Sequence, residues 1–216
     1  MSSRPVGRPP LFDRDDAVLA AARLFWSRGY SGTTTRALSS ALDMSTSSIY
    51  AAFGSKAGLF EEAVRTYAER YRTVYVEACA EPALGDVLGL LLRRSVEEFT
   101  QPSAQHPGCL ISSAAMTDTP DTIDTRTYVT DLHASNERLL RERIERARDE
   151  CQLRADIVPS TLAALVQTLW HGLSTQSNQG AGRDRLLEIV DAALEMLLDA
   201  AAHDRGRDVR PVHARG

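Results

Sequence analysis

The chain has 216 residues, of which 43% are hydrophobic, and its formal net charge is −4. That length allows one domain or two modest ones, and the hydrophobic share is enough for a packed core. No run of about 18 apolar residues occurs, so we expect no membrane-spanning helix. The basic, proline-rich N-terminus lacks the apolar centre of a secretion signal. Cys79, Cys109 and Cys151 are widely spaced, which argues against a disulfide framework or zinc site and suits a reducing cytoplasm. We expect a cytoplasmic protein without a metal or cofactor.

The charge is unevenly distributed along the chain. Residues 1–56 carry seven Lys or Arg and four acidic residues, a net of +3, which leaves −7 for the remainder. A basic head on an acidic body is typical of a protein that touches phosphate at one end only. Because a run of like charge is usually just a solvated face, this asymmetry supports a nucleic-acid contact without establishing it.

Residues 1–12 contain the sequence RPVGRPP, in which proline and glycine exclude a helix, so we expect a flexible basic arm. Its Gly-Arg-Pro core is similar to minor-groove AT-hook segments, and narrow A·T grooves attract arginine. Arg4 and Arg8 are therefore candidate DNA contacts. The alternative is a solubilising tail without a specific partner, and the sequence alone does not separate the two.

The first helix is expected from Asp13 to Arg28. Asp13 can cap its N-terminus, apolar residues recur at helical spacing, and Gly29 can end it as a C-cap. Its expected role is to brace the two short helices that follow.

Two short helices with a sharp joint fit residues 34–53. Thr34 and Ser45 supply capping hydroxyls, and the joint falls at Asp43, a residue type that tolerates the left-handed conformation better than most. The apolar face of the first helix would hold Ala37, Leu38, Ala41 and Leu42. The second helix would turn inward Ile49, Ala52 and Phe53, and outward only small or hydroxylated residues: Thr46, Ser47, Ser48, Tyr50 and Ala51.

A helix whose outer face is this small and polar gains little from facing water, but it is well shaped to enter a DNA major groove of about 12 Å. We therefore interpret the pair as a helix-turn-helix, in which the second helix docks by its N-terminal residues. The alternative, on these residues alone, is an ordinary helical hairpin.

The wider stretch from Ala17 to Phe60 resembles the DNA-binding domain of the TetR family of transcriptional regulators. The matching residues are AARLF at 21–25, RGY at 28–30, GTT at 32–34, Leu38, Ala41, Ser45, IY at 49–50, Phe53 and SKAGLF at 55–60. The family usually has glycine where Asp43 stands, and often glycine where Ser47 stands. We expect the turn to survive these departures, with altered repulsion toward nearby phosphates.

The resemblance implies DNA contacts at single positions: Thr35, Arg36, Thr46, Ser47, Ser48, Tyr50, Ala51 and Lys56. Arg36 is expected to read a base, because arginine to guanine is the commonest specific pair, and Lys56 is expected to hold a phosphate. The implied partner is a double-stranded DNA operator, read as a palindrome by a homodimer.

The rest of the chain predicts further helices only, at residues 55–80, 83–100, 109–116, 121–151, 159–177 and 183–202. The expected fold class is all-α with about nine helices, a three-helix helix-turn-helix domain followed by a larger helical domain for ligand binding and dimerisation. We expect four segments: the flexible arm at 1–12, the DNA-binding domain at 13–56, the larger domain at 57–202, and a disordered tail at 203–216.

The resemblance also implies a small-molecule effector, apolar or aromatic, in a pocket among the helices after residue 83. Candidate lining residues are Phe99, Cys109, Met116, Tyr128, Leu132, His133, Gln167, Trp170 and His171, and the alternative for each is ordinary core. Cys109 starts an expected helix, where a thiol ionises more easily, so sensing of electrophiles or oxidants is a second hypothesis beside a buried small hydrophobe.

Dimerisation is expected through the last two helices, as the resemblance implies. Trp170 and the leucines of both helices are expected to form a four-helix bundle with a second copy. The alternative is that these apolar faces form the core of a monomer.

No nucleophile elbow, P-loop, dinucleotide fingerprint, HExxH or paired CxxC motif occurs in the sequence. We therefore expect a ligand-responsive regulator, a repressor, and no enzymatic activity. The alternatives are a helical protein-interaction module and an all-helical hydrolase built from scattered residues. An interaction module does not explain the basic head or the small polar face at residues 46–51.

Overall fold

The structure, a computed structural model, describes residues 13–100 and 124–201. Within these ranges it contains only α-helices and no strand, which confirms the expected all-α class. None of the helices described is long and apolar enough to cross a membrane. The helices are α1 (Arg14–Gly32), α2 (Thr35–Leu42), α3 (Thr46–Phe53), α4 (Lys56–Cys79), α5 (Leu84–Phe99), α6 (Thr125–Asp149), α7 (Pro159–Asn178) and α8 (Arg183–Ala201).

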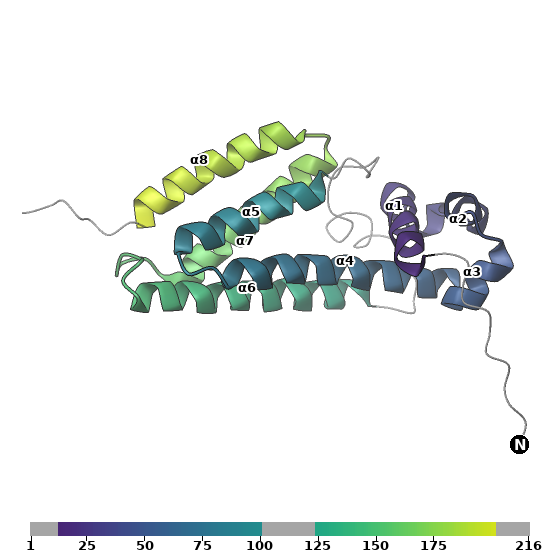
Figure 1. The fold of residues 1–216 in the computed structure, drawn as a ribbon, viewed down its shortest axis with the longest axis horizontal. Helices are drawn as coiled ribbons and strands as arrows, with labels where there is room; N and C mark the ends of the chain where they lie inside the picture. Colours follow the sequence, from purple (N-terminus) through teal and green to yellow (C-terminus); the bar gives the residue numbers. More distant parts are fainter. Residues whose placement is uncertain (1–12, 101–123, 202–216) are drawn as a thin grey trace, which may run out of the picture.

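The helices form a small head and a longer body joined by α4. In Figure 1, α1, α2 and α3 gather at one end, and α4 runs from them along the length of the body. Helix α6 packs beside α4 and against α7, while α5 packs on α4, α7 and α8. The long α4 is therefore the element through which the head and the body are connected.

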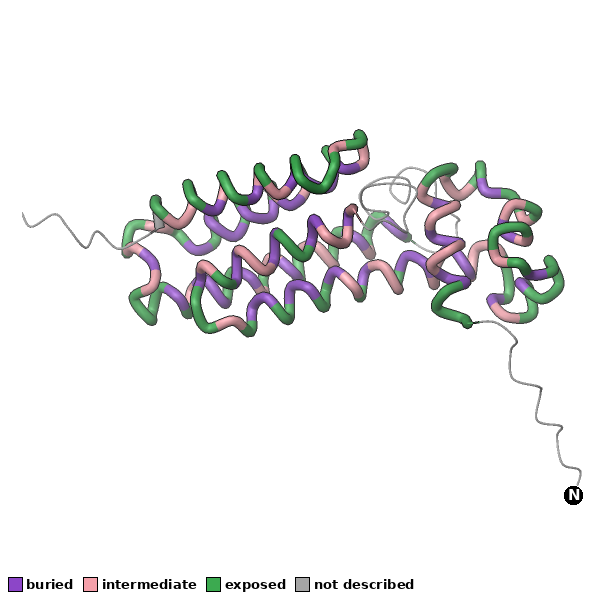
Figure 2. Tube along the Cα trace, turned by 45° about the horizontal axis from the view of Figure 1, so that its top comes forward, coloured by how far each residue is buried: buried purple, intermediate pink, exposed green. Residues whose placement is uncertain are grey.

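Two buried apolar clusters follow this division (Figure 2). The head cluster comes from α1, α2, α3 and the first turns of α4, and it ends at Val64. The body cluster begins at Ala68 on the same helix. Tyr67 and Tyr128 are half-buried and pack against both clusters. Helix α4 therefore contributes to both cores.

The caps expected from the sequence are present. Asp13 accepts from the amides of Asp15 and Asp16 at 2.9 and 3.1 Å, and Ser55 Oγ accepts from the amide of Gly58 at 3.0 Å. These side chains satisfy backbone donors that have no partner inside a helix. The helix starts could therefore be placed from single residues.

The end of α1 differs from the prediction. Gly29 leaves the helix with φ 70 and ψ 172, as expected, but a further helical turn continues to Gly32. The hydroxyl of Thr33 closes that turn by donating to the carbonyls of Gly29 and Leu24 at 2.7 and 3.1 Å. The sequence pattern did not reveal this side-chain contact.

Ala41 is exposed, so its assignment to the apolar face of α2 was wrong; that short helix buries Leu38 alone. The basic arm at 1–12, the helix at 109–116 and the tail at 203–216 lie outside the described residues.

Candidate nucleic-acid interface and buried aromatic–histidine cluster

Helices α2 and α3 are joined by a tight, internally bonded turn. Thr34 Oγ1 accepts from the amide of Ala37 at 3.1 Å and starts α2. Asp43 adopts the left-handed conformation with φ 51 and ψ 40, and the amide of Met44 donates to the carbonyl of Ser39 at 3.1 Å. The Ser39 hydroxyl in turn donates to the carbonyl of Met44. The turn survives the absence of glycine, as expected, because aspartate tolerates this conformation.

The start of α3 carries a cluster of hydroxyls. Ser45 Oγ accepts from the amide of Ser48 at 3.0 Å and lies 2.9 and 2.8 Å from the hydroxyls of Ser47 and Ser48. Ile49 and Phe53 are buried and anchor the inner side of the helix. The outer side is exposed along its length, with all five predicted contact residues on it: Thr46, Ser47, Ser48, Tyr50 and Ala51.

The other predicted contacts flank this face. Arg36 is exposed and Thr35 is half-buried, both in the first turn of α2. Lys56 is the first residue of α4, and its Nζ lies 4.2 Å from the centre of the Tyr30 ring. A cation over an aromatic face is held by the ring's quadrupole, so Tyr30 restricts where the ammonium can point. Arg4 and Arg8 lie outside the described residues.

Arg14 is a positioning residue that the sequence analysis missed. Its Nε and Nη2 both donate to the Glu62 carboxylate at 2.7 Å, and its Nη1 donates to the carbonyl of Ala52 at 3.0 Å. Its guanidinium also lies 4.5 Å from the centre of the Phe53 ring. One side chain at the start of α1 thus ties the end of α3 to α4. No local pattern pairs residues this far apart in sequence, so only the fold could reveal it.

A paired arrangement of this kind, with a capped second helix presenting a small polar face, defines a helix-turn-helix DNA-binding protein. The family model described as bacterial regulatory proteins, tetR family, matches residues 18–63. The HTH-type transcriptional repressor ComR of Escherichia coli (strain K12) is 28% identical over 88% of this chain and 91% of its own length.

Solved structures give a closer match. A cysteine mutant of the TetR family transcriptional regulator CifR, complexed with 26-bp double-strand operator DNA, is 37% identical and superposes with a TM-score of 0.72. The match covers 88% of this chain and 98% of that one. The chain therefore belongs to the TetR family, and it is a DNA-binding transcriptional regulator.

In the body, four of the predicted effector residues meet in one cluster, in which Phe99 and Trp170 are buried and His133 and His171 are half-buried. The ring of Trp170 lies 5.3 Å from Phe99, 5.8 Å from His133 and 5.1 Å from His171, measured between centroids. The two imidazoles lie 4.6 Å apart. Tyr71 also belongs here, 5.3 Å from Trp170 and 5.8 Å from Phe99. These rings come from α4, α5, α6 and α7, so the cluster joins four helices.

Hydrogen bonds connect the cluster to polar side chains. Tyr75 donates its hydroxyl proton to Gln167 Oε1, and Gln167 Nε2 lies 3.5 Å from His171 Nε2. His133 Nε2 is buried without a hydrogen-bond partner in the described part of the chain. Buried donors and acceptors are normally paired, so this nitrogen could form a hydrogen bond with a polar group of a ligand.

Burial keeps both imidazoles neutral. It lowers the pKa of His133 to about 4, with a smaller contribution from the neighbouring His171, and it lowers the pKa of His171 as well. Burial also raises the pKa of Tyr75, which stays protonated. The cluster is therefore a neutral, hydrogen-bonding aromatic environment at physiological pH.

The remaining residues predicted for the body do not all lie where the sequence placed them. Trp170 is only 2% exposed in the single chain and donates from Nε1 to Ser95 Oγ at 2.8 Å, so it does not lie on a face free for a second copy. Tyr128 lies where head and body meet, with the Arg65 guanidinium 5.0 Å from its ring centre. Leu132 is half-buried against the body cluster. Cys109 and Met116 lie outside the described residues.

Among residues 13–100 and 124–201, no three His, Cys, Asp or Glu side chains gather as a metal site would require.

Proposed function

We propose that this protein is a ligand-responsive repressor that binds a palindromic operator as a homodimer and is released from it by a small molecule. The observation that carries the proposal is the outer face of α3, where five small or hydroxylated residues are exposed on a helix anchored from behind by Ile49 and Phe53. Residues 13–56 would form the DNA-binding domain and residues 57–202 the effector and dimerisation domain. The protein would act in the cytoplasm and catalyse no reaction.

Each exposed group at this face has a distinct proposed role. Arg36 reads a base edge, and Lys56, restrained by Tyr30, holds a phosphate. The hydroxyls and small side chains at residues 46–51 allow close approach to base edges, with Tyr50 reaching the backbone. In support, the CifR variant with a similar fold was solved on operator DNA.

Dimerisation is proposed through α7 and α8. Leu165 and Met196 are 50% and 72% exposed, and they border a groove of about 450 Å³ that also includes Leu169, Ile189 and Leu197. Exposed apolar surface rimmed by polar residues, here Arg185 and Glu188, is found at protein–protein interaction sites. Palindromic half-sites require the two α3 helices of a dimer to lie about 34–36 Å apart, and we propose this groove as the surface that a second copy covers.

The effector is proposed to bind at the aromatic–histidine cluster. A ligand with an apolar or aromatic body and one hydrogen-bonding group would meet the rings of Phe99 and Trp170 and the Nε2 of His133, which has no partner among residues 13–100 and 124–201. Because α4 contributes Tyr71 to this cluster and Leu59 and Phe60 to the head, a ligand that displaces α4 would change the spacing of the two heads. By population shift, it must bind the DNA-incompetent form more tightly.

The test is a random-oligonucleotide selection with purified protein at near-physiological salt, followed by binding of the selected site across a salt series. A palindromic site with a steep salt slope is expected. Absence of enrichment, both before and after the protein is unfolded and refolded to remove a bound ligand, would show that the α3 face is not a reader of DNA sequence.

A further inference from the structure

A second pocket lies at the opposite end of α4 from the head. It has a volume of about 400 Å³ and lies between the end of α4 and the C-terminal half of α6. Its walls are Cys79, Val76 and Leu139 on the apolar side, and Arg143, Arg146 and Glu142 on the polar side. This volume falls within the range of ordinary small-molecule sites. None of its residues belongs to the aromatic–histidine cluster.

Arg143 dominates the charge of this pocket. The residue is only 3% exposed. Its Nε and Nη2 donate to the carbonyl of Glu81 at 3.1 and 3.0 Å, and Nη2 donates to that of Pro82 at 2.7 Å. Its Nη1 is buried and has no acceptor among the described residues. A guanidinium held only by carbonyls keeps its full positive charge, and a buried charge without a counter-charge is costly.

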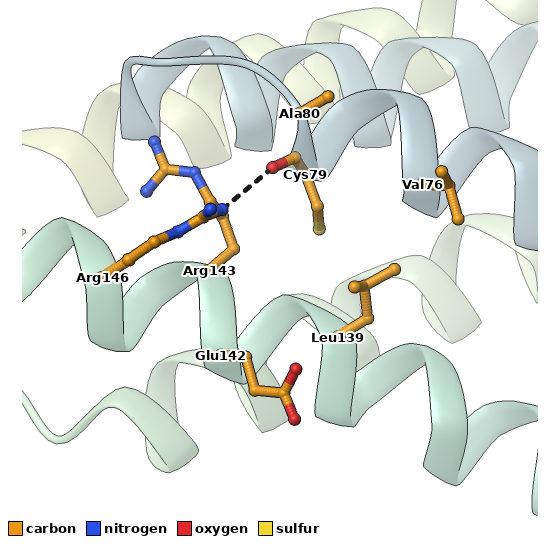
Figure 3. A pocket seen from close by; sticks show the side chains of 7 residues that line it. All are labelled: Val76, Cys79, Ala80, Leu139, Glu142, Arg143 and Arg146. Atoms are coloured by element: carbon orange, nitrogen blue, oxygen red, sulfur yellow. Dashed lines mark hydrogen bonds between the residues drawn. The ribbon is translucent and has the colours of Figure 1, made fainter.

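Arg146 adds a second positive charge beside it. The two guanidinium groups approach the end of α4 from neighbouring turns of α6, and Arg146 Nη2 donates to the carbonyl of Cys79 at 3.4 Å (Figure 3). The carboxylate of Glu142 points away from both groups (Figure 3). Neither arginine has an ion pair within the described ranges, although Arg141 and Arg148 of the same helix do.

The opposite wall is apolar and carries no charge. Val76 and Leu139 face the pocket from α4 and α6 (Figure 3). Burial raises the pKa of the Cys79 thiol to about 11, more than the two nearby arginines lower it, so the thiol is neutral at physiological pH. The pocket thus combines two positive groups at one side with a short apolar surface at the other.

We propose that this pocket binds a small organic anion, with its carboxylate or phosphate group at Arg143 and Arg146 and a short apolar body along Val76 and Leu139. The anion supplies the acceptor that Arg143 Nη1 lacks and the negative charge that both arginines lack. Binding at this site does not depend on the proposed function. Any effect of the anion on operator binding would rest on it.

The test uses isothermal titration calorimetry on the full-length protein, with sodium hexanoate and inorganic phosphate as separate probes and hexanol as the neutral control. Hexanoate is expected to bind and hexanol is not. Arg146→Gln should weaken binding about tenfold or more, because a charged hydrogen bond is lost. Arg141→Gln is the matched control, because it removes an exposed arginine of the same helix that pairs with Glu145 outside the pocket; it should change the affinity by less than about twofold.

Glu142→Gln gives a test that misfolding cannot imitate. This exposed carboxylate lines the pocket, so its removal should strengthen anion binding by about two- to fivefold. Tighter binding of phosphate than of hexanoate, with the same response to the variants, would identify the anionic group as a phosphate. Failure of both probes to bind, or binding that neither Arg146→Gln nor Glu142→Gln alters, would overturn the proposal and leave Arg143 as a clamp on the turn after α4.

Discussion

Replacing Arg14 with alanine should loosen α3 without removing a DNA contact. Arg14 holds the Glu62 carboxylate of α4 with two hydrogen bonds of 2.7 Å and the carbonyl of Ala52, at the end of α3, with a third of 3.0 Å. The variant loses all three, together with the contact to Phe53. The expected result is a less rigid helix-turn-helix and weaker operator binding.

The size of the effect follows from these contacts. The Arg14 and Glu62 side chains are 47% and 32% exposed, so the ion pair contributes only about 0.5–1 kcal/mol despite its two-pronged geometry. The bond to Ala52 adds about 1 kcal/mol, and the contact with Phe53 adds about 0.5 kcal/mol at this exposure. The sum is about 2 kcal/mol, which corresponds to an opening equilibrium constant of the head that is about 30-fold larger.

Amide hydrogen exchange of α1, α2 and α3 measures this opening in the free protein. Arg28→Ala, which removes an exposed charge from the same helix, is the control and should leave exchange unchanged. Operator binding across a salt series completes the test, because each lost phosphate contact lowers the salt slope by about 0.9. Unchanged exchange in Arg14→Ala, together with a slope lower by about one contact, would refute the reasoning and make Arg14 a phosphate ligand.

Four further outcomes are expected. Arg36→Ala should cost about 1–3 kcal/mol of operator-binding free energy and relax the sequence preference at one base position. Lys56→Ala should instead weaken binding to all DNA sequences alike and make the salt dependence of binding less steep. If Arg36→Ala lost the same affinity on every sequence, Arg36 would not read a base. Asp43→Asn keeps a residue that tolerates φ 51 but removes a negative charge, so it should raise operator affinity about twofold at low salt and not at high salt. Burial lowers the pKa of His133 from 6.5 to about 4, so between these pH values the unfolded state binds more protons than the folded state. The free energy of unfolding should therefore fall as the pH decreases through this interval. Urea titrations at several pH values should show a weaker pH dependence for His133→Phe. Leu165→Asp, on the exposed apolar groove, should shift the sedimentation coefficient from dimer to monomer.

The head could be predicted from the sequence because its signals are local. Thr34, Ser45 and Ser55 cap helices by bonding to amides three residues away, and the alternation of buried and exposed residues on α3 follows from helical periodicity alone. The left-handed turn at Asp43 is likewise a property of one residue type. Such contacts depend on near neighbours in the chain, which the sequence displays directly.

The body could be predicted only as a set of helices. Trp170 was expected at an interface because it lies on an apolar stripe of α7, but its indole meets Ser95, 75 residues away, and the ring of Tyr71 on α4. A stripe shows that a face is buried and does not show what covers it. The same limit hid the pairs Arg14–Glu62 and Arg143–Glu81, whose members lie 48 and 62 residues apart in the chain.

On the proposed mechanism, the ligand must release DNA by binding the DNA-incompetent form more tightly than the DNA-binding form. The difference in binding free energy that this needs is larger than the contacts of one head supply. Shifting a population from about 99:1 to 1:99 takes about 5.5 kcal/mol of difference in ligand affinity between the two forms, whereas the contacts of Arg14 sum to about 2 kcal/mol. A homodimer divides the requirement, because two effector sites each supply about half. Each site must then favour the DNA-incompetent form by about 100-fold. The body cluster and the head cluster share α4, so this preference can reach α3 through packing and through the bond between Glu62 and Arg14. On the proposed mechanism, dimerisation through the exposed groove on α7 and α8 would therefore serve regulation as well as the reading of a palindrome.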